Sequence, residues 1–400
     1  MQKAHHARGW YFLPKLTFVI TIGLITAATG FKAAAVDVFT PPVGFYQLPA
    51  VTNQDTYMSN PFTRIPEATG IVGATASAGG GVLNILQAAN TPGWSALQWT
   101  FPATSAQDAT VSNTYYVVLT SGAKAGSWFQ ITNNDASANL YLDTPVEDLT
   151  GVATGVDTFK IIPFWTLGTM FPGGSGVQAS TTQSSGSRRT QILFPAIGST
   201  GINLVPTTTF YFLQSATQGT NWVQVGSGTI NFNTQVILPD MYFIVRQSPP
   251  SASTTAFTLG AVSTWLARTP LYTLPVGSGQ QDNFVAVYRP ASQTLVNLGL
   301  SGSNGFLVSA NVASGSRRDQ ILTLDNVSPG INKVPGNAPG GTYFLTPGAG
   351  GGDSGWRVVG GGATDVGTNV IVQPAGVGII VRKFNTNVVS TVIWSNAPNY

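Results

Sequence analysis

A nine-residue phrase occurs twice in this chain and constrains its fold more than any other feature. Residues 185–193 read SGSRRTQIL and residues 314–322 read SGSRRDQIL, so Arg317 repeats Arg188 after 129 positions. An ordered repeat of this kind indicates two copies of one structural unit. Further matches follow in the same order: Gly201-Ile202-Asn203 with Gly330-Ile331-Asn332, Tyr211-Phe212-Leu213 with Tyr343-Phe344-Leu345, Trp222 with Trp356, and Ile244-Val245-Arg246 with Ile380-Val381-Arg382.

Short segments rich in β-branched and aromatic residues recur after residue 36, and clusters of Gly, Pro, Asn and Asp separate them. This pattern is typical of an all-β protein. We predict tandem small antiparallel β-sandwich or barrel domains, the last two of which are an internal duplication. The predicted boundaries are 36–165 for an N-terminal β domain, 166–268 for the first copy and 269–400 for the second copy.

Residues 1–35 have the three parts of a secretory signal peptide. An apolar run over residues 16–28 lies between a basic region and an A-x-A cleavage site at Ala33 and Ala35. A transmembrane anchor is the alternative, but the run is shorter than the roughly 20 residues that span a bilayer. We predict a mature N-terminus at Val36 and an exported protein of the periplasm, the outer surface or the medium. The basic region contains Lys3, Arg8 and Lys15, and a fourth basic residue, Lys32, lies between the apolar run and the cleavage site.

Removal of the signal changes the charge of the chain. Four of its 18 basic residues and both histidines lie there, so the mature chain has 14 basic residues against 15 acidic ones. A nucleic-acid-binding protein would show a basic patch or stripe, and this composition offers little for one. Hydrophobic residues reach 43% of the chain, enough to bury real cores. Because the chain has no cysteine, packing and backbone hydrogen bonds have to hold the fold without disulfides.

The mature composition also excludes several kinds of chemistry. Without histidine it has no Ser-His-Asp or Cys-His catalysis and no His-based metal site, and we expect no enzymatic activity and no cofactor. Glu67, Asp143, Glu147 and Asp148 are candidates for the carboxylate pair of a glycoside hydrolase. Asp143, Glu147 and Asp148 are also weak candidates for a calcium site, because calcium takes oxygen ligands. We favour a third interpretation, in which this cluster is a solvated loop between strands.

The repeated arginines and tryptophans are the remaining candidate site residues. Arg188, Arg189, Arg317 and Arg318 could bind an anion or a glycan carboxylate, because guanidinium groups match carboxylates. We favour a structural role, in which one arginine of each pair is at least half buried and holds the loop that leads to Gly-Ile-Asn. Stacking on sugar rings is an option for the two matched tryptophans, but core packing is the simpler interpretation. These tryptophans are Trp222 and Trp356.

Four phrases outside the arginine repeats, together with the two Gly-Ile-Asn copies, carry a resemblance to known proteins. The chain resembles an uncharacterised family of predicted-secreted, paralogous bacterial proteins that are rich in β-structure. The resemblance implies a location outside the cytoplasm and says nothing about an activity. The phrases are Pro41-Pro42-Val43-Gly44-Phe45, Leu149-Thr150-Gly151-Val152, Phe164-Trp165-Thr166-Leu167 and Val392-Ile393-Trp394-Ser395.

These observations lead to one principal functional hypothesis and two alternatives. The principal hypothesis is a non-enzymatic structural or surface protein outside the cytoplasm, of the adhesion type, whose partners are envelope glycans or other copies of itself. A carbohydrate-binding module array is the first alternative, with a site on each copy. An outer-membrane β-barrel is the second, and the aromatic C-terminal Tyr400 gives it some support. No transmembrane helix is expected after processing.

Overall fold

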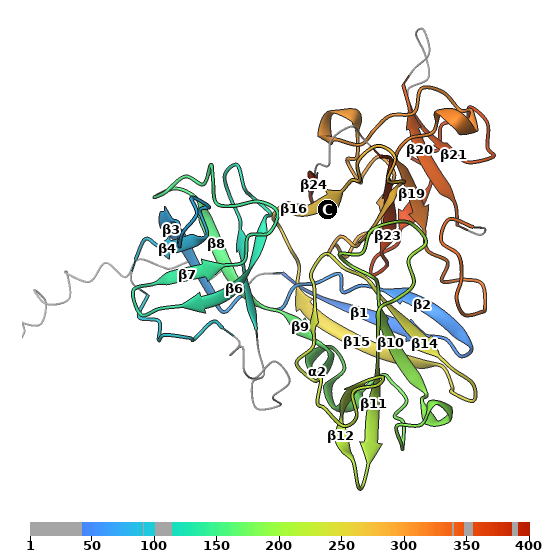
Figure 1. Ribbon diagram of the computed structural model, residues 1–400, viewed down its shortest axis with the longest axis horizontal. Helices are drawn as coiled ribbons and strands as arrows, with labels where there is room; N and C mark the ends of the chain where they lie inside the picture. Colours follow the sequence, from blue (N-terminus) through green and yellow to red (C-terminus); the bar gives the residue numbers. More distant parts are fainter. Residues whose placement is uncertain (1–41, 91, 101–113, 338–339, 348–354, 386–390) are drawn as a thin grey trace, which may run out of the picture. The chain divides into compact units, whose positions relative to one another are not determined.

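The computed structural model describes residues 42–90, 92–100, 114–337, 340–347, 355–385 and 391–400 (Figure 1). The predicted signal peptide over residues 1–35 lies outside these residues. The described chain is nearly all β, as the sequence predicts, and its strands form several antiparallel sheets and one closed barrel. In this part of the chain, no helix is long and apolar enough to cross a membrane. The short helical segments are α2 (Leu167–Met170) and the 3-10 turns η2 (Pro172–Gly174), η3 (Ser185–Ser187), η4 (Gly302–Asn304) and η5 (Ser314–Ser316).

The barrel closes in the order β3-β4-β7-β6-β5-β8. Side chains that alternate along its strands point inward and fill its interior, as the two-residue period of a strand requires. Phe129, Ile131, Leu140, Phe159 and Ile161 are among these buried residues. The barrel is therefore a packed core. Its strands are β3 (Ala68–Ala76), β4 (Ile85–Ala88), β5 (Tyr115–Leu119), β6 (Trp128–Asn134), β7 (Asn139–Leu142) and β8 (Thr158–Pro163).

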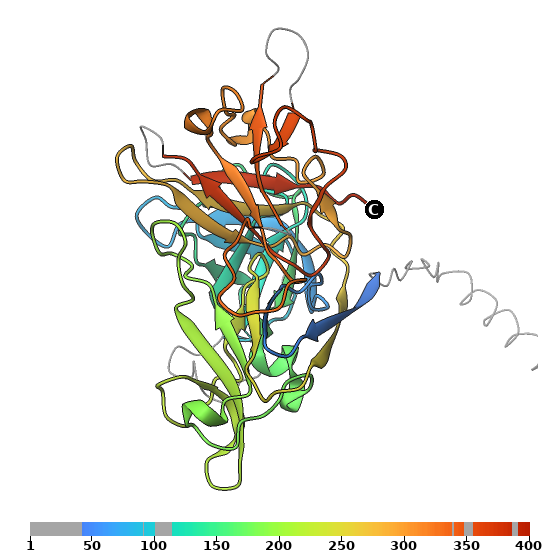
Figure 2. The ribbon, with the colours of Figure 1, turned by 90° about the vertical axis from the view of Figure 1, so that its right-hand side faces the viewer.

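The remaining strands form two groups with the same connectivity. Each group has one five-stranded sheet and two two-stranded ribbons, and the second group lies together in both views, in orange to red (Figures 1 and 2). The first five-stranded sheet has the order β12-β11-β10-β14-β2, and its ribbons are β1-β15 and β9-β13. The strands are β1 (Val43–Ala50), β2 (Gln54–Met58), β9 (Trp165–Thr166), β10 (Thr190–Phe194), β11 (Thr208–Ser215), β12 (Gly219–Gln224), β13 (Val236–Ile237), β14 (Phe243–Gln247) and β15 (Thr254–Ala261).

The second sheet has the order β21-β20-β19-β23-β17, and its ribbons are β16-β24 and β18-β22. Reading both sheets from the tryptophan strand gives the same order, which is what the internal duplication predicts. The strands are β16 (Ala267–Tyr272), β17 (Gln281–Val285), β18 (Gln293–Thr294), β19 (Gln320–Thr323), β20 (Thr342–Thr346), β21 (Gly355–Val358), β22 (Ile371–Gln373), β23 (Ile379–Lys383) and β24 (Thr391–Asn396).

The predicted N-terminal domain over 36–165 has to be corrected. Its first two strands do not belong to the barrel, because β1 pairs with β15 and β2 pairs with β14 of the first copy. The barrel over residues 68–163 is therefore an insertion between β2 and β9 of that copy. Strand patterns in a sequence give the period of burial but not the partner strand, so the insertion had no local signal.

The strand register shifts one of the matched segments, the Tyr-Phe-Leu phrase, by one residue. Trp222 lies opposite Phe212, whereas Trp356 lies opposite Leu345. Tyr211 therefore corresponds to Phe344 and not to Tyr343, one residue away from the alignment by sequence. A shift by one residue exchanges the two faces of a strand, and accordingly Phe212 and Tyr343 both point into their cores.

A buried arginine ties the last strand to the second copy. Arg289 is 1% exposed, and its guanidinium makes five hydrogen bonds, all to neutral acceptors. It donates to the carbonyls of Ser263 at 3.0 Å, Trp265 at 2.7 Å and Asn396 at 2.9 Å. The other two bonds go to the side-chain oxygens of Ser263 and Asn396. Arg289 thus joins the connection between β15 and β16 to the end of β24.

Candidate functional site

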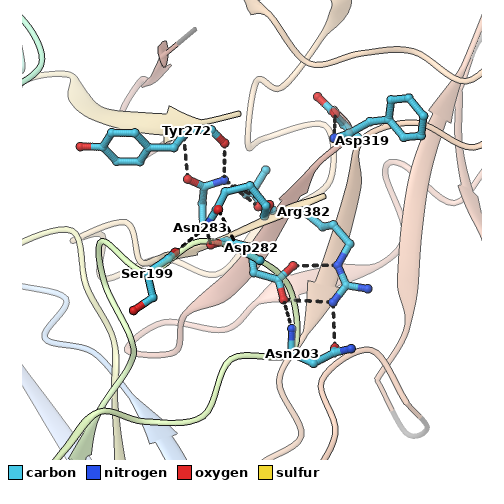
Figure 3. A network of polar contacts seen from close by, with 11 residues as sticks. Ser199, Asn203, Tyr272, Asp282, Asn283, Asp319 and Arg382 are labelled. Atoms are coloured by element: carbon cyan, nitrogen blue, oxygen red, sulfur yellow. Dashed lines mark hydrogen bonds and ion pairs between the residues drawn. The ribbon is translucent and has the colours of Figure 1, made fainter. Parts of the chain in front are cut away.

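Asp282 and Arg382 form the centre of the polar network in Figure 3. They face each other on neighbouring strands β17 and β23. Arg382 donates from Nε to Asp282 Oδ1 at 2.7 Å and from Nη2 to Asp282 Oδ2 at 3.0 Å. The same Nη2 donates to Asn203 Oδ1 at 2.9 Å, and the backbone N–H of Asn203 donates to Asp282 Oδ2 at 2.8 Å. This pair in the second copy therefore holds the Gly-Ile-Asn loop of the first copy.

The reverse contact has nearly the same geometry. Asp55 on β2 faces Arg246 on β14, and Arg246 donates to both oxygens of Asp55 at 2.7 Å. Arg246 Nη2 also donates to Asn332 Oδ1 at 2.7 Å, and the backbone N–H of Asn332 donates to Asp55 Oδ2 at 2.7 Å. We call the two arrangements the loop clamps: Asp282, Arg382 and Asn203 in one, Asp55, Arg246 and Asn332 in the other. Each copy binds the loop of its counterpart.

The backbone of each loop is shaped for its clamp. Asn203 and Asn332 both have φ of 55°, in the left-handed region that Asn tolerates better than most residues. The backbone N–H of Asp282 donates to the carbonyl of Gly201 at 2.9 Å, and that of Asp55 donates to the carbonyl of Gly330 at 2.9 Å. Arginine–carboxylate forks with two parallel bonds are directional, so each clamp fixes the orientation of its loop.

An apolar cluster from both sheets accompanies the clamps. It contains Leu193 and Ile244 of the first copy and their counterparts Leu322 and Ile380 of the second. Gly378 is required here, because an added Cβ would lie 2.2 Å from the ring of Tyr242. Burial raises the pKa of Tyr57 and of Tyr242, which belong to this cluster. The hydrogen bond to Asp55 raises the pKa of Arg246, which keeps that clamp charged.

The repeated arginines do not hold these loops, so that part of the prediction is wrong. They lie partly exposed between a 3-10 turn and a strand in both copies. Arg188 donates to the carbonyl of Gln183 at 3.0 Å and lies over the ring of Tyr211. Arg317 lies over Phe344 and Arg318 over Phe384. Arg188, Arg317 and Arg318 thus contact residues of their own copy, while Arg246 and Arg382 bind the loops.

The two tryptophans are buried core residues. Trp222 is 0% exposed and Trp356 is 4% exposed. The backbone N–H of Trp222 donates to Asn233 Oδ1, and that of Trp356 donates to Asp365 Oδ1, so both strands are fixed in the same way. Neither ring can stack on a sugar at the surface, and the core interpretation is the one that fits.

The candidate calcium residues are engaged in other contacts. Glu147 accepts from Lys124 at 2.7 Å and from Arg268 at 3.1 Å. Burial alone would raise the pKa of Glu147, but hydrogen bonds from Lys124 and Ser127 outweigh it and lower that pKa. Asp148 accepts the backbone N–H groups of Leu83 and Thr150, while Asp143 is exposed. Within the described ranges, no three acidic or histidine side chains come together to hold a metal ion.

The cavities that accompany these residues differ in kind. An open recess of about 310 Å³ lies beside Glu147 and Asp148 and is also lined by Lys124. An enclosed cavity of about 10 Å³ lies against Tyr116 and Trp165, which is room for one water at most. Glu67, the remaining candidate for a carboxylate pair, accepts a hydrogen bond from the Tyr115 hydroxyl at 2.9 Å.

The fold and the loop clamps define an all-β protein whose polar clusters bind its own backbone. The chain matches no family model, no curated protein and no solved structure at a significant level of similarity. The resemblance to predicted-secreted bacterial proteins therefore stays an expectation from the sequence.

Asp240 carries a pH-dependent prediction. Burial raises its pKa to about 6, while Trp128 donates a hydrogen bond to it. The groups that face it are tyrosines, and its charge adds to the rise that burial causes in the pKa of Tyr116, Tyr272 and Tyr288. The pKa of Asp240 in the folded protein lies above the unfolded value of roughly 3.9. The contribution of this carboxyl to stability is therefore fully present below about pH 3.9, where it is neutral in both states, and is lost as pH rises through about 6.

We therefore expect Asp240→Asn to be more stable than the wild type at pH 7.5 by up to roughly 3 kcal/mol, which corresponds to about two pH units between the two pKa values. At pH 4 the difference should vanish. Chemical denaturation at several pH values measures it. Asp135→Asn is the control, because hydrogen bonds from Asn139 lower the pKa of Asp135, and the pH trend should be opposite. A difference for Asp240→Asn that does not change with pH would contradict the assignment.

Proposed function

We propose that this chain is a non-enzymatic structural or surface protein of the adhesion type that works outside the cytoplasm. The observation that carries the proposal is the use of the charged side chains. Asp55, Asp282, Arg246 and Arg382 fix loops between the copies, and Arg289 fixes the last strand. Such groups stabilise architecture, and their donors and acceptors are already engaged. The export signal predicted from the sequence supports the location.

An exposed apolar face supports contact with another surface. On the ribbon β1-β15, Phe45 stacks on Phe257 at 5.5 Å between ring centroids. Phe45 is 60% exposed and Phe257 is 56% exposed. Val43 and Leu259 extend this face and are 59% and 65% exposed. Contiguous exposed apolar residues of this kind mark interaction sites on soluble proteins. We call these four residues the ribbon patch.

Fractionation of cells tests the proposal. We expect the mature chain, beginning at Val36, in the envelope fraction, and we expect protease added to intact cells to digest it. The double variant Phe45→Ser, Phe257→Ser should move at least severalfold from the envelope to the soluble fraction, because it removes the stacked pair. Val327→Ser is the matched control, since Val327 is 82% exposed and lies outside the ribbon patch.

The opposite outcomes are equally clear. A chain that retains Met1 and stays with cytoplasmic markers would exclude an extracytoplasmic role. Specific binding to a glycan array would instead support the carbohydrate-binding alternative. A ribbon-patch variant that fractionates like Val327→Ser would show that these side chains do not attach the protein to the envelope.

A further inference from the structure

A lysine and an aspartate are buried together in the second copy. Asp319 directly precedes β19, and Lys383 is the last residue of β23. Their side chains are 0% and 1% exposed, and Lys383 Nζ contacts Asp319 Oδ2. Lys383 Nζ also donates to the carbonyl of Gly305 at 2.6 Å and lies over the ring of Phe306. The amine and the carboxyl are therefore held in contact without bulk water.

The first copy fills the same place with a neutral pair. Thr190 and Gln247 correspond to Asp319 and Lys383, and Thr190 Oγ1 donates to Gln247 Oε1 at 2.7 Å. Both residues of this pair are 0% exposed. The fold can therefore be built without burying two charges here. Since a buried ion pair seldom stabilises a protein more than a neutral replacement, the charged pair calls for a different explanation.

Two backbone N–H groups donate to the carboxyl of Asp319, an arrangement that would activate its carbon for attack by an amine. Its Oδ1 accepts the backbone N–H of Phe384 at 2.7 Å, and its Oδ2 accepts the backbone N–H of Leu307 at 2.7 Å. Backbone donors so placed polarise a carbonyl and stabilise negative charge that develops on its oxygen. Burial raises the pKa of Asp319, which favours the neutral carboxyl. Lys383 Nζ contacts Oδ2 of this carboxyl, one bond away from the carbon that it would attack.

We propose that Lys383 and Asp319 form an intramolecular isopeptide bond. A proton passes from the lysine ammonium to Asp319 Oδ2, which leaves a neutral amine beside a neutral carboxyl. Nζ attacks Cγ, and a bond between nitrogen and carbon forms. The bond between Cγ and Oδ2 breaks, and Oδ2 leaves as water with two protons from the lysine. The reaction is a condensation that needs no oxidant, reductant or further reactant.

The bond would link the residue before β19 covalently to the end of its neighbouring strand β23. It would close a loop between residues that are 64 positions apart. Cross-links of this kind restrict the unfolded chain, as disulfides do. The chain contains no cysteine and so cannot form a disulfide. The isopeptide bond is an amide, and reducing conditions would not break it.

Mass spectrometry of the full-length protein tests the bond directly. Trypsin cleaves after Arg318, Lys333 and Arg382, so the bond predicts a branched peptide in which residues 319–333 are joined to residues 383–400. Its mass should equal the two peptides less one water, and cleavage after Lys383 should be lost. Detection of this peptide supports the proposal. A digest that contains residues 384–400 only as a free linear peptide overturns it.

Two variants make the test specific. Asp319→Thr with Lys383→Gln copies the neutral pair of the first copy. It should have the full sequence mass and release residues 383–400 as an unbranched peptide, because the last tryptic cleavage is then after Arg382. Thr190→Asp with Gln247→Lys transfers the charged pair to the first copy, and it should lose a second water. A transferred pair that folds with an unchanged mass would contradict the claim that such a buried pair suffices for the reaction, because the backbone N–H of Gln178 already donates to residue 190 as that of Leu307 donates to Asp319.

Discussion

Replacing Arg289 by alanine is expected to lower the free energy of unfolding by roughly 3–5 kcal/mol. The side chain is 1% exposed, so its loss leaves a cavity. It also removes the guanidinium donors from the carbonyls of Trp265 and Asn396, while the carbonyl of Ser263 keeps only the hydroxyl of Tyr400 as a donor. A buried acceptor without a partner keeps its full desolvation cost. Chemical denaturation of the full-length variant measures the loss.

Two controls separate the hydrogen bonds from the charge. Arg289→Lys keeps the charge but has three donors on one atom instead of a planar fork, so most of the loss should remain. Arg189→Ala removes a partly exposed arginine before β10 and should have a much smaller effect. If Arg289→Lys is as stable as the wild type, the positive charge and not the fork is what the site requires.

Replacing Asp282 by alanine is expected to free a loop in the other copy. Asp282 accepts the backbone N–H of Asn203 and both donors of Arg382, and it is 1% exposed on its side chain. Hydrogen bonds to a charged acceptor contribute roughly 1.5–3 kcal/mol each. The backbone amide of Asn203 should therefore exchange with solvent about 10–100 times faster, because each factor of ten corresponds to roughly 1.4 kcal/mol.

The equivalent substitution in the other clamp, Asp55→Ala, tests whether each acid holds one loop only. Asp55→Ala should accelerate exchange at Asn332 and leave Asn203 protected, because Asp55 binds only the loop of the second copy. Hydrogen exchange of both loops in both variants gives four rates, and two should rise. Equal acceleration of both loops in either variant would mean that these amides exchange through global unfolding and not through local release of one loop. No acceleration would mean that the apolar cluster alone holds the loops.

The loop clamps show how far sequence reasoning can reach for such a site. Arg246 and Arg382 were visible as equivalent residues at the ends of matched segments, but nothing near them indicated an acid. The signal that could have found the acids is a second repeated phrase, Gln54-Asp55 and Gln281-Asp282. It lies far from the arginine repeats because the barrel separates β2 from the rest of the first copy. Matching the two copies over the whole chain would have been required.

The repeated arginine pairs were the more conspicuous feature and the less informative one. Two adjacent arginines beside an apolar strand attract attention because the chain has few charges. In the structure, Arg188 and Arg317 cover the aromatic residues Tyr211 and Phe344 within their own copies. A guanidinium over a ring stabilises its own sheet, and it needs no partner that is distant in the sequence.

The sequence by itself determined the class of the fold, and its matched phrases predicted two equivalent units. Turn residues and β-branched residues act over a few neighbouring positions, so local patterns reveal strands, and the matched tryptophans were correctly assigned to the cores. Only the tertiary structure decided that β1 and β2 join the first copy, that Tyr211 corresponds to Phe344, and that each copy binds the loop of the other. Strand pairing and sheet packing depend on contacts between distant residues, and the two-residue period of a strand carries no record of its partner.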